Sequence, residues 1–259
     1  MPELPEVEHA VQRLRVALVG RRIVRARALH QSMRRALSPA RLRALAGRVV
    51  RAVTRRGKHQ LLHLDDGALL HVHFRMNGDW ETHAAGATAP RHVRFAMELD
   101  DGTIVVLTDS RALATVAFVR SAADLPELGP EADDQTIAPA VLRAALSSRS
   151  APIKMALLDQ RLLAGIGNIY ASESLWHARV SPMARARSLT LARVARLLAG
   201  IRRALARGMT RDGRYAEGSS HEFRVYDREG EPCRRCSARI KRVTQGQRST
   251  YFCPRCQSR

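Results

Sequence analysis

Four cysteines near the end of the chain restrict the fold more than any other feature of the sequence. Two residues separate Cys233 from Cys236 and Cys253 from Cys256, and sixteen residues lie between the two pairs. Each pair places two thiolates on a tight turn, and two such pairs complete a tetrahedral zinc site. Because four protein ligands leave no open coordination position, we expect one structural zinc ion. An iron–sulfur cluster or a redox-active dithiol is the alternative.

The segment between the two cysteine pairs is strongly basic. It contains the turn-forming Gly246 and four cations, namely Arg239, Lys241, Arg242 and Arg248. A zinc-tied β-hairpin would present these cations to a phosphate backbone. A charged hairpin that contacts only solvent is the alternative.

Positive charge is in excess over the whole chain. The 259 residues include 44 Lys and Arg against 24 Asp and Glu, which gives a formal net charge of +20. This balance favours a polyanionic partner, either nucleic acid or an anionic membrane surface. A compositional bias toward arginine is the alternative. Hydrophobic residues make up 45% of the chain, a share typical of globular proteins that excludes intrinsic disorder.

The sequence contains neither a membrane-spanning nor an export segment. No stretch of 18 apolar residues is present, so we expect no transmembrane helix. The first ten residues, MPELPEVEHA, carry three glutamates and no apolar core, which excludes a secretory signal and a transit peptide. We therefore expect a cytoplasmic protein whose cysteines bind metal and form no disulfides.

Residues 1–120 have the pattern of a β-rich N-terminal domain. Apolar residues at 7, 11, 14 and 18 predict a helix over 7–19, and 38–46 predicts a short second helix. Short alternating runs fill the rest of the segment, with DDG turns at 65–67 and 100–102. Several short strands at this spacing indicate a sandwich or a barrel.

The second half of the chain has a different pattern. Residues 121–136 carry five acids and no Lys or Arg, and we interpret them as an interdomain linker. Residues 137–222 form a helical domain and 223–259 a cysteine-bearing module. Within the helical domain we predict a loop at 208–222 and four helices, at 139–147, 152–162, 168–178 and 188–207.

Pro2 directly follows the initiator methionine. Loss of Met1 would leave a secondary amine, and an N-terminal amine has a pKa near 8, so it is a usable nucleophile near neutral pH. Its attack on an aldehyde carbon gives an iminium ion directly. Glu3 and Glu6 lie beside it and have the chemistry of a general acid and base.

Further motifs connect this N-terminus to a known family. They are ALLDQRLLAGIGNIYASESLWHARVSP at 156–182, the pair Gly57-Lys58 and GQRSTYFCPRCQ at 246–257. Together with MPELPEVE and the four cysteines, they closely resemble the formamidopyrimidine-DNA glycosylase / endonuclease VIII family of bacterial DNA repair. The resemblance implies an α+β fold: an N-terminal β-sandwich with flanking helices, a helix–two-turn–helix domain and a C-terminal β-hairpin zinc finger.

The same resemblance implies a bifunctional glycosylase and AP lyase. Pro2 matches the nucleophile that forms a Schiff base on the damaged nucleotide, before β- and δ-elimination cut the strand. Glu3 matches the residue that protonates the deoxyribose ring oxygen, and Glu6 supports the site. Lys58 matches a strand lysine that holds a phosphate beside the lesion. The implied substrates are 8-oxoguanine and formamidopyrimidines in double-stranded DNA, and the implied protein is a nucleoid-associated monomer.

Other residues match positions that contact DNA in the family. Asn168 matches a phosphate-binding asparagine at a helix start, where backbone amides attract anions. Arg248 matches the zinc-finger arginine that holds the phosphates flanking the flipped nucleotide. Met76 and Arg111 match residues that fill the gap left by that nucleotide. Lys154 and Glu173 match positions near the lesion pocket.

His73 is also a candidate for DNA contact. It alternates with His71 on an expected strand, so the pair could also bind a metal, or lie in the core.

One loop departs from the family pattern. Where formamidopyrimidine-DNA glycosylases usually have DPRRFG, residues 109–114 read DSRALA, so Leu113 stands in place of an aromatic wedge. The loop at 208–222 is also shorter than in members that cover 8-oxoguanine. These departures leave two alternatives open: an endonuclease VIII-like enzyme for oxidised pyrimidines, and a catalytically inactive DNA-binding protein.

Overall fold

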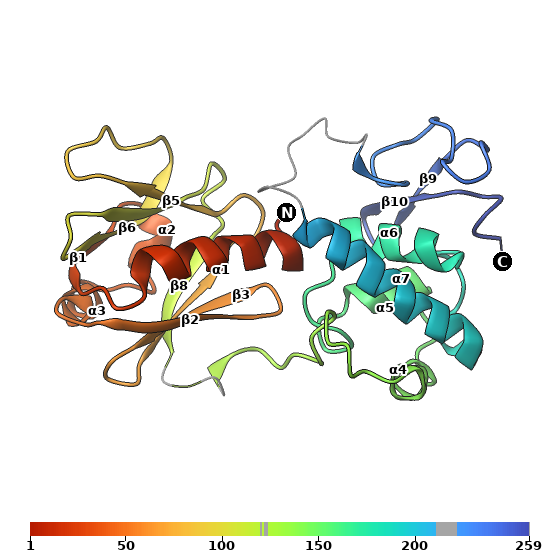
Figure 1. Ribbon diagram of the computed structural model, residues 1–259, viewed down its shortest axis with the longest axis horizontal. Coiled ribbons are helices and arrows are strands. Elements are labelled where there is room, and N and C mark those ends of the chain that lie inside the picture. The colour runs from red at the N-terminus through yellow and green to blue at the C-terminus, as the bar shows by residue number, and fades with distance from the viewer. Residues whose placement is uncertain (120, 122–123, 211–221, 259) are drawn as a thin grey trace. The chain divides into compact units, whose positions relative to one another are not determined.

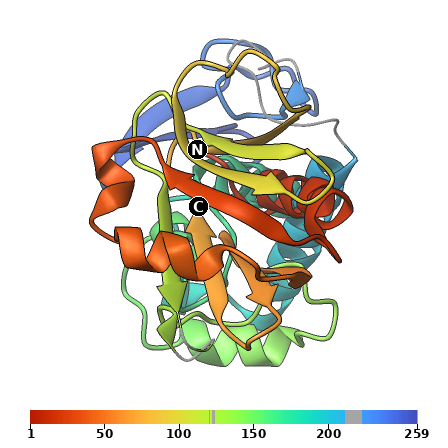
Figure 2. The same ribbon diagram turned by 90° about the vertical axis from the view of Figure 1, so that its left-hand side faces the viewer.

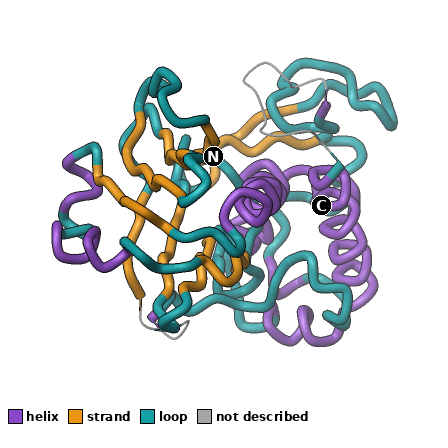
Figure 3. Tube along the Cα trace, turned by 60° about the vertical axis from the view of Figure 1, so that its left-hand side comes forward, coloured by secondary structure: helices purple, strands orange, loops and turns teal. Residues whose placement is uncertain are grey.

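The computed structural model describes residues 1–119, 121, 124–210 and 222–258. The chain forms two compact units, Met1–Pro126 and Glu127–Arg259. The first unit contains eight of the strands together with the 15-residue helix at its N-terminus, and the second unit is mainly helical (Figure 3). The α+β class predicted from the sequence is confirmed.

The N-terminal unit contains two four-stranded antiparallel sheets. The first has the order β1 (Ile23–Ala28), β6 (Val93–Leu99), β7 (Ile104–Thr108) and β5 (Asp79–His83). The second has the order β2 (Val50–Arg56), β3 (His59–Leu64), β4 (Leu69–His73) and β8 (Thr115–Val119). Residues of both sheets share one core, and Figure 2 shows the two sheets as separate layers, so of the two predicted architectures the sandwich is confirmed.

Helix α1 (Leu4–Leu18) runs along both sheets (Figure 1). Its apolar face, predicted from positions 7, 11, 14 and 18, is buried in the shared core with strand residues such as Leu62 and Phe95. The helix begins before the predicted start at residue 7, because Glu3 and Glu6 form a capping box at its N-terminus. Two short helices, α2 (Gln31–Arg34) and α3 (Pro39–Leu45), follow β1.

The C-terminal unit is built on four helices and one hairpin. They are α4 (Pro139–Leu146), α5 (Ile153–Leu158), α6 (Asn168–Ala178), α7 (Leu191–Met209) and the pair β9 (Lys241–Gln245) and β10 (Arg248–Phe252). A single 3₁₀ turn, η2 (Ala186–Ser188), precedes α7.

Two predicted helix boundaries in this unit are wrong. Helix α5 ends at Leu158, not at 162, because the Asp159 carboxylate accepts a hydrogen bond from the backbone N–H of Arg161 at 3.0 Å and turns the chain. Helix α7 begins at Leu191, where the Thr190 hydroxyl caps it, and continues to Met209. The predicted loop at 208–222 therefore starts later, and its residues 211–221 lie outside the described residues.

The acidic segment 121–136 is not a linker over its whole length. Backbone hydrogen bonds join Gly129 to Gln160 at 2.9 Å and Ala132 to Ala164 at 3.0 Å, and Glu131 forms a parallel bridge with Ala164. The second half of the segment is therefore part of the C-terminal unit.

None of the helices in the described parts of the chain combines the length and the apolar character needed to cross a bilayer.

Candidate catalytic and DNA-binding site

The predicted catalytic residues at the N-terminus lie at the start of α1. Pro2 is buried, and Glu3 and Glu6 are 1% and 8% exposed. The backbone N–H of Glu3 donates to Glu6 Oε2 at 2.9 Å, and the Glu3 side chain accepts from the backbone of Glu6. These reciprocal bonds fix the backbone next to Pro2. Glu6 thus positions the backbone at the start of α1, and its supporting role in catalysis stays a prediction.

Lys58 lies in the tight turn that joins β2 to β3. Gly57 before it has a φ of 56°, a left-handed conformation that glycine adopts without strain. The turn pairs Arg56 with His59 and leaves Lys58 only 7% exposed. A cation this deeply buried is costly unless it has a partner. Lys58 is not without a partner in the structure.

His73 belongs to a group of three histidines on β3 and β4. His59 Nδ1 lies 2.7 Å from His71 Nε2, and the rings of His59 and His73 meet edge-on at 4.8 Å. Burial and the neighbouring histidines and cations lower the pKa of His59 to about 4 and that of His73 to about 3. The backbone N–H of Arg75 donates to His73 Nδ1 at 2.9 Å. His73 is therefore neutral at pH 7 and carries its proton on Nε2, where it can donate to a phosphate.

Met76, Arg111 and Leu113 lie on two loops that contact each other. Met76 is in the turn after β4, and the other two are in the loop between β7 and β8. A hydrogen bond of 3.0 Å from Asn77 Nδ2 to Ser110 Oγ joins the loops. Leu113 is 44% exposed and Arg111 is exposed, so both are available to a DNA duplex.

Asp109 organises the second of these loops, a role that was not predicted from the sequence. Its carboxylate is 1% exposed and accepts from the backbone N–H groups of Arg111 at 3.0 Å, Leu113 at 2.6 Å and Ala114 at 2.7 Å. Ala112, at the centre of the loop, has a φ of 54°. An aspartate at the start of a turn is the signal that could have identified it.

In the C-terminal unit, Asn168 is the first residue of α6. Gly165 in the preceding turn has a φ of 101°, and the Gln160 side chain holds this turn by accepting from Gly165 N and donating to Ile166 O. Asn168 Nδ2 donates to the carbonyl oxygen of Ser249 at 3.0 Å. The helix start therefore lies against the cysteine-bearing hairpin, next to Arg248.

Arg248 begins β10 and is exposed. Gly246 and Gln247, with φ of 50° and 61°, form the two-residue turn before it. Lys154, fully buried on α5, holds the strand from behind: its Nζ donates to Ser249 O at 2.8 Å and to Thr250 Oγ1 at 2.7 Å. From its sequence position Lys154 was expected near the lesion pocket, and this bridge to the hairpin was not predicted.

Glu173 has contacts other than those expected. It is 3% exposed, and its carboxylate accepts from the backbone N–H groups of Arg224, Val225 and Tyr226 at 2.8 to 3.0 Å. These bonds hold the segment that leads into the cysteine module. These three bonds give the buried Glu173 carboxylate a positioning role, and its predicted place near the lesion pocket stays a prediction.

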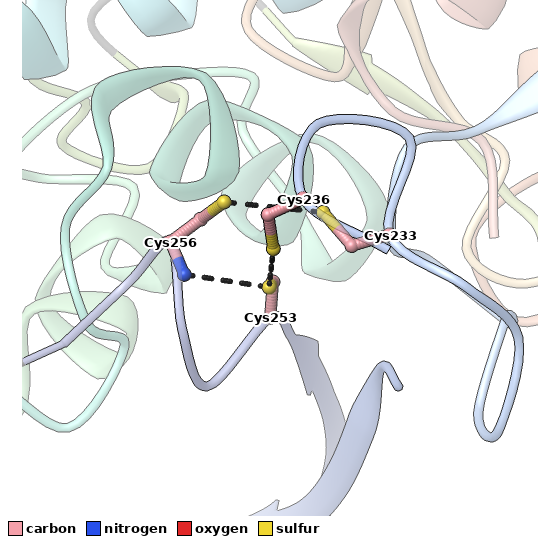
Figure 4. Close-up of side chains that lie close together, drawn as sticks. All are labelled: Cys233, Cys236, Cys253 and Cys256. Atoms are coloured by element: carbon pink, nitrogen blue, oxygen red, sulfur yellow. Dashed lines mark hydrogen bonds between the residues drawn. The ribbon is translucent and has the colours of Figure 1, made fainter. Parts of the chain in front are cut away.

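The four cysteines converge on one point (Figure 4). Their sulfur atoms all lie within 4.8 Å of one another, at 3.4 Å for Cys236–Cys253 and 4.0 Å for Cys233–Cys256. Tetrahedral zinc with ligands at about 2.3 Å requires sulfur atoms about 3.8 Å apart, so the site fits zinc. All four are free thiols, and within the described residues no other set of three or more ligand side chains gathers this closely.

Three family models match the chain in order. The formamidopyrimidine-DNA glycosylase N-terminal domain matches residues 1–116, the H2TH domain of the same enzymes matches 128–219, and a zinc finger found in FPG and IleRS matches 230–259. The chain belongs to the formamidopyrimidine-DNA glycosylase family. This membership confirms the resemblance drawn from the sequence motifs. The zinc-finger match and the cysteine geometry confirm one structural zinc.

Relatives and solved structures of this glycosylase family cover the whole chain. The formamidopyrimidine-DNA glycosylases of Chloroflexus aggregans and Paracoccus denitrificans are 42% and 38% identical, over 99% of this chain and 98% and 100% of their own lengths. A structure of MutM with DNA containing carbocyclic 8-oxo-G aligns with a TM-score of 0.92 at 29% identity, covering both chains completely. The structure of Lactococcus lactis Fpg with DNA that contains an abasic site aligns with a TM-score of 0.91 at 28% identity. The alignment covers 99% of this chain and 100% of that chain.

Proposed function

We propose that the chain is a bifunctional DNA glycosylase and AP lyase that removes oxidised bases from double-stranded DNA, with Pro2 as the nucleophile. The single observation that carries this proposal is the three-domain match, which joins the N-terminal glycosylase domain to the helix–two-turn–helix domain and the zinc finger in one chain. The relatives' names and the DNA-bound neighbours support the same activity. The enzyme would act as a monomer on the bacterial chromosome.

The chemistry begins once Met1 is removed. Met1 is 38% exposed, so a peptidase can reach it, and the mature Pro2 amine then attacks C1′ of the damaged nucleotide. The bond from C1′ to the base breaks, and the base leaves with the proton that the Pro2 nitrogen loses. Glu3, held at the start of α1, then protonates the ring oxygen, and the bond from C1′ to this oxygen breaks, which opens the sugar and leaves an iminium ion between Pro2 and C1′. The resulting iminium ion acidifies the 2′ proton. Two eliminations then expel the 3′ and 5′ phosphates, and hydrolysis of the iminium frees Pro2.

The DNA would be held by groups from both units. Lys58 and His73 donate to phosphates from the N-terminal unit, and Asn168 and Arg248 from the C-terminal unit. Met76, Arg111 and Leu113 would fill the space left by the flipped nucleotide.

Borohydride trapping tests the proposal. The mature protein, with loss of Met1 verified by mass spectrometry, is incubated with duplexes that contain 8-oxoguanine opposite cytosine, 5-hydroxyuracil or an abasic site. We expect a covalent adduct with 8-oxoguanine, and a strongly reduced yield for Pro2→Gly or for protein that retains Met1. If the mature protein forms no adduct with any duplex, the binding-only alternative is correct.

A second candidate, excision of oxidised pyrimidines, rests on Leu113. Leucine at the exposed tip of the 109–114 loop stacks less well than an aromatic ring. Adducts with 5-hydroxyuracil and the abasic site but none with 8-oxoguanine would favour this candidate. Leu113→Phe should then restore part of the 8-oxoguanine adduct, whereas Leu113→Ala should not.

A further inference from the structure

Arginine side chains gather around the last turn of α6, at the opposite end of this helix from Asn168. Arg235, from the Cys233–Cys236 turn, lies over the Trp176 ring at 3.9 Å and donates to the Trp176 carbonyl oxygen at 3.1 Å. Arg224 lies 5.9 Å from the same ring. Both guanidinium groups are thereby held at the C-terminal end of the helix.

Helix α7 adds Arg203 and Arg207, which are exposed and lie four residues apart on one face. The two helices pack closely at Gly200, where a Cβ atom would lie 2.5 Å from the Ser174 carbonyl oxygen. We call Arg203, Arg207, Arg224 and Arg235 the α6 arginine cluster. Burial and the charges of these four arginines lower the pKa of His177 to about 4.

Within the described residues, acidic side chains do not pair with this cluster. The acid that acts on Arg224 is Glu173, whose carboxylate already accepts three backbone hydrogen bonds. Elsewhere arginines are paired, as in Arg13–Asp79 at 2.7 Å and Arg149–Asp159 at 2.8 Å. Unbalanced like charges repel one another, so an anion that binds here would be stabilising.

His177 supports the presence of a ligand site. Both of its ring nitrogens are buried and have no hydrogen-bond partner in the part of the chain that the structure describes. Buried polar atoms normally have such a partner, and exceptions are often explained by a bound group.

The chemistry of the cluster favours phosphate. Guanidinium groups are planar and donate two parallel hydrogen bonds to a phosphate. A protein partner would need an apolar centre, but the exposed large hydrophobic residues of this unit's described part, Val141, Leu191 and Val243, are not in the cluster. Interfaces with DNA are polar and positively charged, as the cluster is.

The cluster is separate from the phosphate site at Asn168. His177 lies nine residues further along α6, which corresponds to about 13 Å along the helix axis. We propose that the α6 arginine cluster is a second phosphate-binding site, which holds the backbone of a second DNA duplex while the first is bound at the other end of α6. Such a site would let the protein pass between DNA segments.

A two-duplex capture experiment tests this proposal. Zinc-loaded protein is bound to an immobilised duplex containing an abasic-site analogue, and a labelled undamaged duplex is added over a range of salt concentrations. The test variant is Arg203→Ala/Arg207→Ala. The control is Arg34→Ala/Arg35→Ala, which removes the same charge at two exposed positions of the N-terminal unit.

We expect wild type and control to capture the second duplex equally. For the test variant, the slope of log affinity for the second duplex against log salt should fall by roughly 1.8, about 0.9 for each phosphate that an arginine no longer neutralises. Its affinity for the immobilised duplex should not change. Equal capture by all three proteins, or no capture by wild type, overturns the proposal. An equal loss of affinity for both duplexes also overturns it, because the cluster would then belong to the first site.

Discussion

The ammonium group of Lys154 lies 2.8 Å from the carbonyl oxygen of Ser249, so a fully buried residue of α5 fixes the strand that carries Arg248. Asn168 donates to the same oxygen at 3.0 Å. The proposed phosphate ligands Asn168 and Arg248 are therefore joined through one carbonyl group. Their spacing is set inside the C-terminal unit before DNA binds.

Lys154→Met should remove the hydrogen bonds by which this side chain holds the hairpin. The substitution preserves length but leaves Thr250 Oγ1 without the donor, and a lost buried hydrogen bond costs about 1–3 kcal/mol. We expect this decrease in the free energy of unfolding, measured with denaturant, and weaker binding of lesion duplex. The control Lys241→Met removes a charge from an exposed strand position and should alter unfolding by less than about 0.5 kcal/mol. Equal stability of the two variants would contradict the role of Lys154.

Asp109→Asn should disturb the loop that carries Arg111 and Leu113. In the wild-type protein both carboxylate oxygens accept from backbone N–H groups. In either orientation of the asparagine amide, its NH₂ group faces one of these donors and cannot accept from it, so the loop loses at least one of the three hydrogen bonds. We expect a destabilisation of about 1–3 kcal/mol and slower base excision in single-turnover assays.

The matched control is Asp101→Asn, at an exposed turn where the carboxylate accepts from Thr103 N at 3.0 Å. This variant should excise at the wild-type rate. If both variants excise equally fast, Asp109 does not position the loop.

Removal of zinc should disorder residues 233–256 and weaken DNA binding, because the hairpin that carries Arg248 is closed by the metal site. A chelator treatment followed by metal analysis and limited proteolysis measures the first effect, and titration with lesion duplex measures the second. Added zinc should restore both. Unaltered affinity in protein verified to be free of zinc would argue against this role of the hairpin.

The three histidines on β3 and β4 should make stability depend on pH. The pKa of His59 falls from 6.5 to about 4 and that of His73 to about 3 on folding, because the rings are buried near Lys58, Arg75 and each other. The unfolded chain then binds more protons than the folded chain below pH 6.5. The free energy of unfolding should therefore decrease as pH falls from 6.5 toward 4.

His59→Gln/His73→Gln should flatten this decrease. Denaturant unfolding at several pH values measures it for both proteins, with pH above 7 as the reference, where the imidazoles are neutral in both states. A double variant that loses stability as steeply as wild type over this window would show that other groups cause the decrease.

Much of the architecture followed from short segments of sequence. The apolar positions 7, 11, 14 and 18 predict the buried face of α1, the 2-16-2 cysteine spacing predicts the zinc site, and the order of the motifs identifies the family. Helix ends were less predictable: α5 stops at Leu158 because the Asp159 side chain turns the chain there, although the apolar spacing continues.

Contacts between residues far apart in the chain were decided only by the tertiary structure. Lys154 meets Ser249 across 95 residues, Asn77 meets Ser110 across 33, and Glu173 holds a segment about 50 residues away. A side chain's neighbours in the sequence determine caps, turns and metal-ligand pairs, because those interactions span only a few residues. The partner of a buried carboxylate, ammonium or guanidinium group depends on how whole helices and strands pack against one another. A local sequence pattern does not predict that packing.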